Sequence, residues 1–288
     1  MNSNLIKVAI FTGGLLGAVG AALPTQAGVL YSNGFETNIT DWNAFGGGFN
    51  ATRVASGTNG VTSESGSFHA ENSATGSASR WGGYNYGAGN AVATVFQEYW
   101  TEVGVYLDVG GGWANDTRFD FSSAINNAAG LHRRDFTFNG GFYNDSDGSP
   151  GTGTNRFIFS ASNNSQPGSA FAKNPARSPI AISTTGWFTF QHHFYNNAGV
   201  LAADMTIFDS SNLPVGFWML SDPSDLIGGI GGNRYGWFAY NQFSTLAFDN
   251  AELRTLDAAV PEPGTWTLLV IALLSLFGFG MMRRHADV

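Results

Sequence analysis

The sequence predicts an antiparallel β-sandwich or jelly roll, flanked by a short apolar segment at each end. Gly, Asn, Ser and Thr are abundant, there are 39 Gly and 24 Phe among 288 residues, and Lys, Glu and Leu are few. Turn residues combined with aromatics favour strands joined by polar loops. No stretch of the central region shows a helical period over three turns. These observations indicate an all-β central domain.

Alternating hydrophobicity locates individual strands. Val103, Val105 and Leu107 alternate with small or polar residues, which is a period of two. Residues 122–129 are the one stretch compatible with a short helix. A hairpin is expected where turn residues follow 201–209 and the apolar alternation resumes at Val215. Further strands are expected at 136–138, 187–195, 201–209, 215–219, 234–240 and 246–253.

Residues 1–27 have the features of a secretory signal peptide. One early cation, Lys7, precedes a mostly apolar stretch that Pro24 ends. Thr25 and Ala27 are small residues at positions −3 and −1 of a cleavage site after Ala27. An uncleaved N-terminal anchor is the alternative, but the glycines of this stretch make it a poor membrane helix and favour cleavage.

Residues 265–282 predict a single C-terminal transmembrane helix. The apolar run within this segment has 17 residues, the short end of what spans a bilayer core of about 30 Å at about 1.5 Å per residue. Arg283 and Arg284 follow at once and resist translocation. The basic tail, residues 283–288, is therefore expected to stay in the cytoplasm, with the central domain on the other side of the inner membrane.

The linker ahead of this helix, residues 257–264, contains a Pro-Glu-Pro motif. The order of motif, helix and arginines resembles the PEP-CTERM sorting signal of Gram-negative bacteria. In that family exosortase, a membrane transpeptidase-like enzyme, is thought to recognise the motif, and the family is associated with exopolysaccharide and biofilm production. An ordinary membrane anchor is the alternative. The resemblance assigns sorting to Val260, Pro261, Glu262 and Pro263, and retention to Arg283 and Arg284.

A second resemblance concerns the fold of residues 28–256. The segments 100–108, 132–136 and 246–253 are similar to stretches of exported bacterial proteins with a concanavalin-like fold. This resemblance implies a jelly-roll sandwich for the exported domain and, by itself, no activity.

Charge and cysteine content exclude several functions. Residues 28–260 hold ten Lys and Arg against nineteen Asp and Glu, a net charge of about −9. Such a surface repels phosphate backbones, so nucleic acid is not an expected partner. The chain has no cysteine, which excludes cysteine catalysis and thiolate metal sites.

A glycoside hydrolase is the enzyme alternative, and it needs two carboxylates about 5–9 Å apart. Glu98 and Glu102 would share one face of a strand, but about 13 Å apart at about 3.3 Å per residue. That separation fits neither geometry, so we expect no enzyme and no catalytic residue. A pair assembled from different strands stays open.

One loop is a candidate calcium site. Asn144, Asp145 and Asp147 precede Gly148 and offer hard oxygen ligands, which suit calcium. The loop lacks the terminal glutamate of an EF-hand, and a plain polar loop is the alternative reading. Calcium is the one cofactor this sequence suggests, and it would make the chain a calcium-dependent adhesin.

Aromatic residues in a Gly/Asn-rich stretch are candidate glycan contacts. Exposed aromatic rings can stack on the apolar faces of sugars, although most large aromatics in a sandwich belong to the core. We therefore expect an exported surface or matrix protein that is structural or carbohydrate-interacting, with exopolysaccharide as a candidate partner. The candidate contacts are Trp81, Tyr84 and Tyr86, and the alternatives are Trp113, Trp218 and Trp237.

Overall fold

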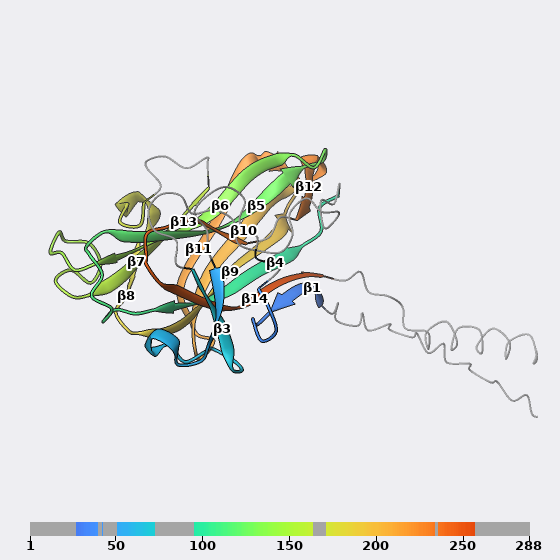
Figure 1. The fold of residues 1–288 in the computed structure, drawn as a ribbon. Helices are drawn as coiled ribbons and strands as arrows, with labels where there is room; N and C mark the ends of the chain where they lie inside the picture. Colours follow the sequence, from blue (N-terminus) through green and yellow to red (C-terminus); the bar gives the residue numbers. More distant parts are fainter. Residues whose placement is uncertain are drawn as a thin grey trace, which may run out of the picture. The chain divides into compact units, whose positions relative to one another are not determined.

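The computed structural model describes residues 27–39, 42, 51–72, 95–163, 171–233 and 236–256, which belong to one compact unit (Figure 1). Their regular structure is almost entirely β. The strands are β1 (Ala27–Asn33), β2 (Ala51–Ala55), β3 (Phe68–Asn72), β4 (Tyr99–Leu107), β5 (Thr117–Asn127), β6 (His132–Tyr143), β7 (Arg156–Asn163), β8 (Ile180–Ile182), β9 (Gly186–Asn197), β10 (Val200–Asp209), β11 (Pro214–Leu226), β12 (Ile230–Asn233), β13 (Trp237–Asn241) and β14 (Leu246–Leu256). Three single turns of 3-10 helix lie between them, η1 (Thr58–Gly60), η2 (Pro175–Arg177) and η3 (Ile227–Gly229).

The strands form two antiparallel sheets. The larger has the order β11-β10-β9-β4-β14-β3-β2, with β1 also paired to β14. The smaller has the order β12-β5-β6-β7-β8, with β13 also paired to β5. Strand β14 pairs with β4 along one edge, and along its other edge with β3 and then with β1. The last described strand is thus an inner strand of the larger sheet.

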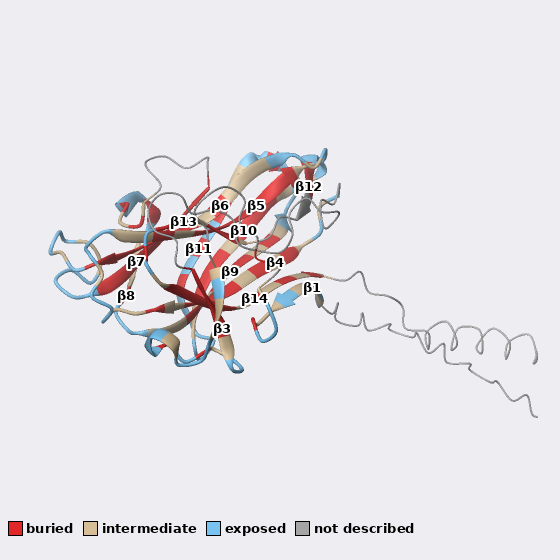
Figure 2. Cartoon of the chain, viewed as in Figure 1, coloured by how far each residue is buried: buried red, intermediate tan, exposed pale blue. Residues whose placement is uncertain are grey.

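Phenylalanines of the two sheets pack against one another to form the core, so the architecture is a β-sandwich. Phe190 of β9 meets Phe138 of β6 and Phe159 of β7 at ring-centroid distances of 5.3 and 5.1 Å. Phe194 meets Phe136 in the same way at 5.1 Å. These edge-to-face contacts add to the burial of the rings. The buried faces of the central strands are visible in Figure 2.

His192 lies in this core, between rings of both sheets. Its side chain is fully buried, and its Nε2 is 3.0 Å from the backbone oxygen of Phe136. Burial lowers the pKa of His192 to about 3. His193 points to the opposite face, as alternation along a strand requires, and stacks on Trp100 with ring centroids 4.2 Å apart.

Most of the predicted strands are present, and the short helix is a wrong prediction. Residues 122–127 belong to β5, whose side chains from Phe121 to Asn126 are all buried. Burial on both faces hides the polar alternation by which a half-exposed strand is recognised. The hairpin of β10 and β11 is confirmed, with a turn in which Asn212 has a φ of 58°.

The predicted terminal segments lie outside the described residues, apart from Ala27, the first residue of β1. The predicted sorting motif, the apolar run and the two arginines all fall within 257–288. In the part of the chain that the structure describes, no helix is long and apolar enough to cross a membrane.

Candidate functional site

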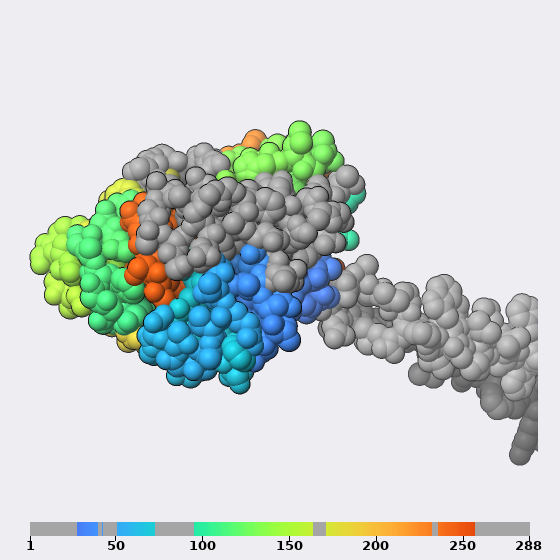
Figure 3. All heavy atoms as spheres, in the orientation of Figure 1, coloured from blue at the N-terminus to red at the C-terminus, as the bar shows by residue number. Residues whose placement is uncertain are grey.

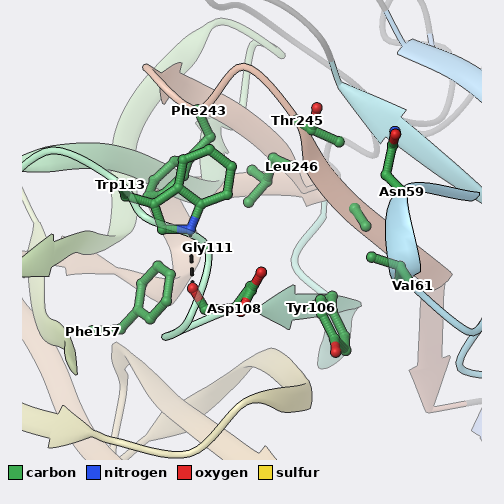
Figure 4. A pocket seen from close by; sticks show the side chains of 11 residues that line it. Asn59, Val61, Tyr106, Asp108, Gly111, Trp113, Phe157, Phe243, Thr245 and Leu246 are labelled. Carbon is green, nitrogen blue, oxygen red and sulfur yellow. Dashed lines mark hydrogen bonds between the residues drawn. The ribbon is translucent and has the colours of Figure 1, made fainter. Parts of the chain in front are cut away.

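A pocket of about 240 Å³ opens where β4 ends, and segments distant in the sequence build it (Figure 4). The pocket combines residues near positions 60, 110 and 245. In the space-filling view these parts of the chain are neighbours, with the orange part between the green and the blue parts (Figure 3). Four segments contribute lining residues: the loop before β3, the end of β4 with its following loop, β7, and the entry to β14. The lining residues are Asn59, Val61, Tyr106, Asp108, Gly111, Trp113, Phe157, Phe243, Thr245, Leu246 and Ala247.

The indole of Trp113 forms one wall, and its orientation is fixed. Its Nε1 donates to the backbone oxygen of Asp108 at 3.0 Å, and its ring packs on Phe243 with centroids 5.0 Å apart. Gly111 fits between them, because a Cβ there would lie 2.5 Å from Trp113 Nε1 and 2.9 Å from Asp108 Oδ2. The turn after β4 therefore needs glycine to bring indole and carboxylate together.

Polar groups lie within reach of this aromatic wall. The Asp108 side chain lies between the Trp113 side and the Val61 side of the pocket (Figure 4). Its Oδ1 accepts the backbone N–H of Gly110 at 2.9 Å, which orients the carboxylate. Burial, and then the charge of Asp108, raises the pKa of Tyr106, so the phenol stays neutral. Asn59 and Thr245 add an amide and a hydroxyl to the lining.

A buried chain of polar side chains supports the Asn59 side of the pocket. Asn59 Nδ2 donates to Glu71 Oε2 at 2.8 Å, Glu71 Oε1 is 3.4 Å from His69 Nε2, and His69 Nδ1 is 3.1 Å from Ser63 Oγ. Burial lowers the pKa of His69, although Glu71 opposes the shift. Ser63 is not part of the lining. The set therefore positions Asn59 and does not face a ligand.

Sequence reasoning had no signal for this arrangement. His69 and Glu71 are two residues apart on β3 and so share a face, but Ser63 and Asn59 reach them only because the loop before β3 folds back. Trp113 was named among the alternatives and lines the pocket. Trp218 and Trp237 are buried, with 7% and 6% of their surface exposed.

The aromatic residues named first, Trp81, Tyr84 and Tyr86, lie outside the described residues. Ala27, the predicted signal-cleavage residue, is described, and it pairs with Leu256 of β14.

The calcium candidate is occupied by the protein's own cations. Lys173 Nζ lies 2.6 Å from Asp145 Oδ2 and 2.5 Å from Asp147 Oδ2. The fully buried Arg156 adds a contact of 3.1 Å to Asp145 Oδ1. The hydrogen bonds from Lys173 are the main cause that holds the pKa of Asp145 and of Asp147 below the usual range. Among the described residues, no group of three or more His, Asp or Glu side chains is placed to hold a metal ion.

The two glutamates considered for catalysis are engaged separately. Glu98 Oε1 is 2.7 Å from His193 Nε2, whereas Glu102 Oε2 accepts from Gln191 at 2.7 Å. A different carboxyl, Glu64, comes from the loop before β3 and lies directly over Gly104 of β4. Its pKa is raised by burial, and the charge of Glu102 adds to the shift.

No protein-family model matches this chain, and no curated protein matches it. Solved structures that are similar to it at low identity include the following three. The CBM2 module of the evolved Dit of Lactobacillus casei BL23 phage J-1 has a TM-score of 0.38 and 9% identity, covering 81% of this chain and 98% of that one. The metal-free form of lectin I-B4 from Griffonia simplicifolia has a TM-score of 0.31 and 11% identity, and the match covers 77% of this chain and 97% of the lectin. Winged bean acidic lectin complexed with methyl-alpha-D-galactose has a TM-score of 0.31 and 9% identity, and the match covers 81% of this chain and 99% of the lectin. Such distant likeness assigns no site to this chain.

Proposed function

We propose that this chain is a non-catalytic carbohydrate-interacting protein whose sugar site is the pocket beside Trp113. The observation that carries the proposal is the fixed indole wall with an oriented carboxylate next to it. An aromatic face accepts the apolar side of a sugar ring, while Asp108, Asn59 and Thr245 offer acceptors to its hydroxyls. Its volume of about 240 Å³ is below the roughly 300–1,000 Å³ of drug-sized pockets and suits one small ring.

The setting of this activity is a proposal from the two ends of the sequence. A signal peptide ending at Ala27, a Pro-Glu-Pro motif and a C-terminal apolar run imply export and anchoring in the inner membrane. An exosortase-type enzyme would then sort the protein to the cell surface or matrix. Exopolysaccharide would be the polymer that it meets there.

Sugar binding is tested with the purified full-length chain in detergent, by retardation in gels that contain the host exopolysaccharide. We expect retardation by the wild type and its loss in Trp113→Ala. Trp100→Ala is the matched control, because Trp100 stacks on His193 on another part of the sheet and is absent from the pocket. Equal retardation of Trp113→Ala and wild type would refute this site.

Sorting is tested separately in the native host by replacing Pro261 and Glu262 with Ala. The expected result is a protein that keeps its tail and stays with the membrane fraction. Unchanged size and unchanged release into the medium would show that this motif does not direct processing.

A glycoside hydrolase on the same fold is the second candidate, favoured by one observation. Glu64 lies over Gly104 and accepts from Asn250 Nδ2 at 3.0 Å, beside the buried Asp249, whose pKa burial raises to about 6. A carboxyl with a raised pKa can act as a general acid near neutral pH. New reducing ends from β-glucans, abolished by Glu64→Gln, would favour this candidate over a pure binding protein.

A further inference from the structure

A second hollow, of about 320 Å³, lies at the same end of the larger sheet. The connection between β8 and β9 forms one side of it, and the turn between β10 and β11 forms the other. Most of its polar groups are hydroxyls, and it has one indole. The lining residues are Ala181, Ile182, Ser183, Thr184, Thr185, Gly186, Trp187, Phe188, Asp209, Ser210 and Val215.

An aromatic pair links the second hollow to the first. Tyr106 of β4 and Trp187 of β9 are direct cross-strand partners, and their ring centroids are 5.4 Å apart. Tyr106 lines the pocket beside Trp113, whereas Trp187 lines the second hollow. The two spaces therefore lie on either side of one pair of touching rings.

Local hydrogen bonds hold this junction in place. Trp187 Nε1 donates to the backbone oxygen of Thr62 at 2.8 Å, so the indole is tied to the loop that also carries Asn59 and Val61. The backbone N–H of Val109 donates to Thr185 Oγ1 at 3.1 Å, which ties the loop after β4 to the edge of the second hollow. The walls of both spaces are thus fastened to each other before any ligand arrives.

The charges of the two linings agree. Each contains one carboxylate, Asp108 in the first and Asp209 in the second, and neither contains Lys, Arg or His. A carboxylated or sulfated sugar would meet like charge in both spaces, with no cation to offset it. A neutral sugar would meet acceptors for its hydroxyls, and an amino sugar would gain an opposite charge.

We propose that the two hollows are adjacent subsites for one linear glycan of neutral or amine-bearing sugars, with Tyr106 and Trp187 as the platform between them. The inference rests on the proposed function, because it assumes that the pocket beside Trp113 takes a sugar. A chain that occupies both subsites binds the second as an intramolecular event, so its affinity exceeds that of a single sugar without any new contact type.

The test measures binding of the full-length chain in detergent by calorimetry against cello-oligosaccharides and malto-oligosaccharides of increasing length. Chitosan oligomers serve as the amine-bearing probe and oligogalacturonates as the anionic probe. We expect one neutral series to gain at least about tenfold in affinity once it is long enough to reach both hollows, and then to level off. We expect oligogalacturonates of equal length to bind at least about tenfold more weakly, and chitosan oligomers to bind at least as well as the neutral series.

Variants separate the two subsites. Trp187→Ala should remove the gain with length and also weaken binding of the shortest ligand, because its indole holds the loop that carries Asn59 and Val61. Trp113→Ala should abolish binding at every length. Ser210→Trp fills the second hollow from an exposed turn without removing a core contact, so it should remove the gain with length even if Trp187→Ala folds poorly.

The outcomes distinguish the inference from the proposed function. Binding that depends on Trp113 but is equal at all lengths, or that Ser210→Trp does not change, would overturn the two-subsite inference and leave the sugar pocket standing. Absence of binding by any oligosaccharide would overturn both. Oligogalacturonates that bind as tightly as neutral chains would overturn the assignment of the ligand class.

Discussion

Ala27 and Leu256 are antiparallel partners, so the first and the last described residues of the sandwich lie side by side. The same ladder pairs Gly28 with Thr255 and Asn33 with Ala251. Cleavage after Ala27 would remove one residue of β1 and leave the rest of the strand on β14. The predicted processing site is therefore compatible with the finished sheet.

Removal of β1 tests how much this pairing contributes. A variant that lacks residues 28–33 after the signal peptide exposes one edge of β14 and withdraws Tyr31 from the core. We expect the free energy of unfolding to fall by about 2 kcal/mol or more. For a domain of this size that lowers the midpoint of thermal unfolding by roughly 4–8 °C. An unchanged midpoint, followed by circular dichroism, would show that β1 is dispensable.

A Cβ at Gly104 on β4 would lie 1.9 Å from Glu64 Oε2, so the end of the Glu64 side chain would have to shift. Gly104→Ala should displace this carboxylate from its hydrogen bond with Asn250 Nδ2 and so lower the free energy of unfolding by about 1 kcal/mol. Gly228→Ala is the matched control, since a Cβ at Gly228 has no atom within 4 Å. Addition of Glu64→Ala should recover part of the loss in urea titrations, and strict additivity of the two changes would contradict the clash.

Asp249 should make stability depend on pH. Burial raises its pKa from 3.8 to about 6, so the folded state holds this proton more tightly than the unfolded chain does. Its stabilising contribution is complete below about pH 4 and is lost as the pH rises through 6. Asp249→Asn mimics the protonated form at every pH. The wild type gains stability as the pH is lowered from 7 to 4, so the stability of the variant relative to the wild type should decrease over that change. A constant difference in urea titrations across this range would refute the shift.

His192 should act in the opposite direction. Its pKa is lowered from 6.5 to about 3 by burial, so the unfolded chain binds this proton first. The contribution of neutral His192 is present above pH 6.5 and is lost as the pH falls toward 3. His192→Gln should therefore gain stability relative to wild type below pH 6.5, as measured by thermal unfolding at pH 7, 5.5 and 4. If the stability of His192→Gln relative to the wild type did not increase as the pH is lowered, the lowered pKa of His192 would be contradicted.

Calcium should have no effect on the wild-type protein. Lys173 already bridges Asp145 and Asp147, and Arg156 contacts both. Thermal unfolding should be the same in EDTA and in millimolar calcium, whereas Lys173→Met frees the carboxylates and should become sensitive to calcium. A calcium-dependent rise in the midpoint of thermal unfolding of the wild type would instead support the adhesin alternative.

Alternation predicted the strands that bury one face, and it failed where both faces are covered. Strands β4, β9 and β10 follow the expected positions, and in β9 the alternation of buried and partly exposed residues is complete from Phe188 to Tyr195. The short helix predicted for residues 122–129 is absent, and residues 122–127 belong to β5, where Ser122, Ser123 and Asn126 are polar and yet buried. Hydrophobic period carries no information where a polar side chain enters the interior.

The candidate site was predictable only in part. The sequence offers Trp113 as one of several candidate tryptophans, whereas its pattern indicates only strand positions for Tyr106, Asp108 and Trp187 and a turn at Gly111. They become a site because the loop after β4 turns back through Gly111 and because β4 pairs with β9. Neither event leaves a spacing that can be read along the chain.

By itself, the sequence determined the β class of the central domain and the expectation of an exported, tail-anchored chain, because side-chain period and long apolar runs are local properties. The tertiary structure decided which aromatics lie in the core and which line a pocket. It also brought Glu64 over Gly104 and placed Lys173 between Asp145 and Asp147. These are contacts between segments distant in sequence, and only the pairing of strands and the return of loops set them.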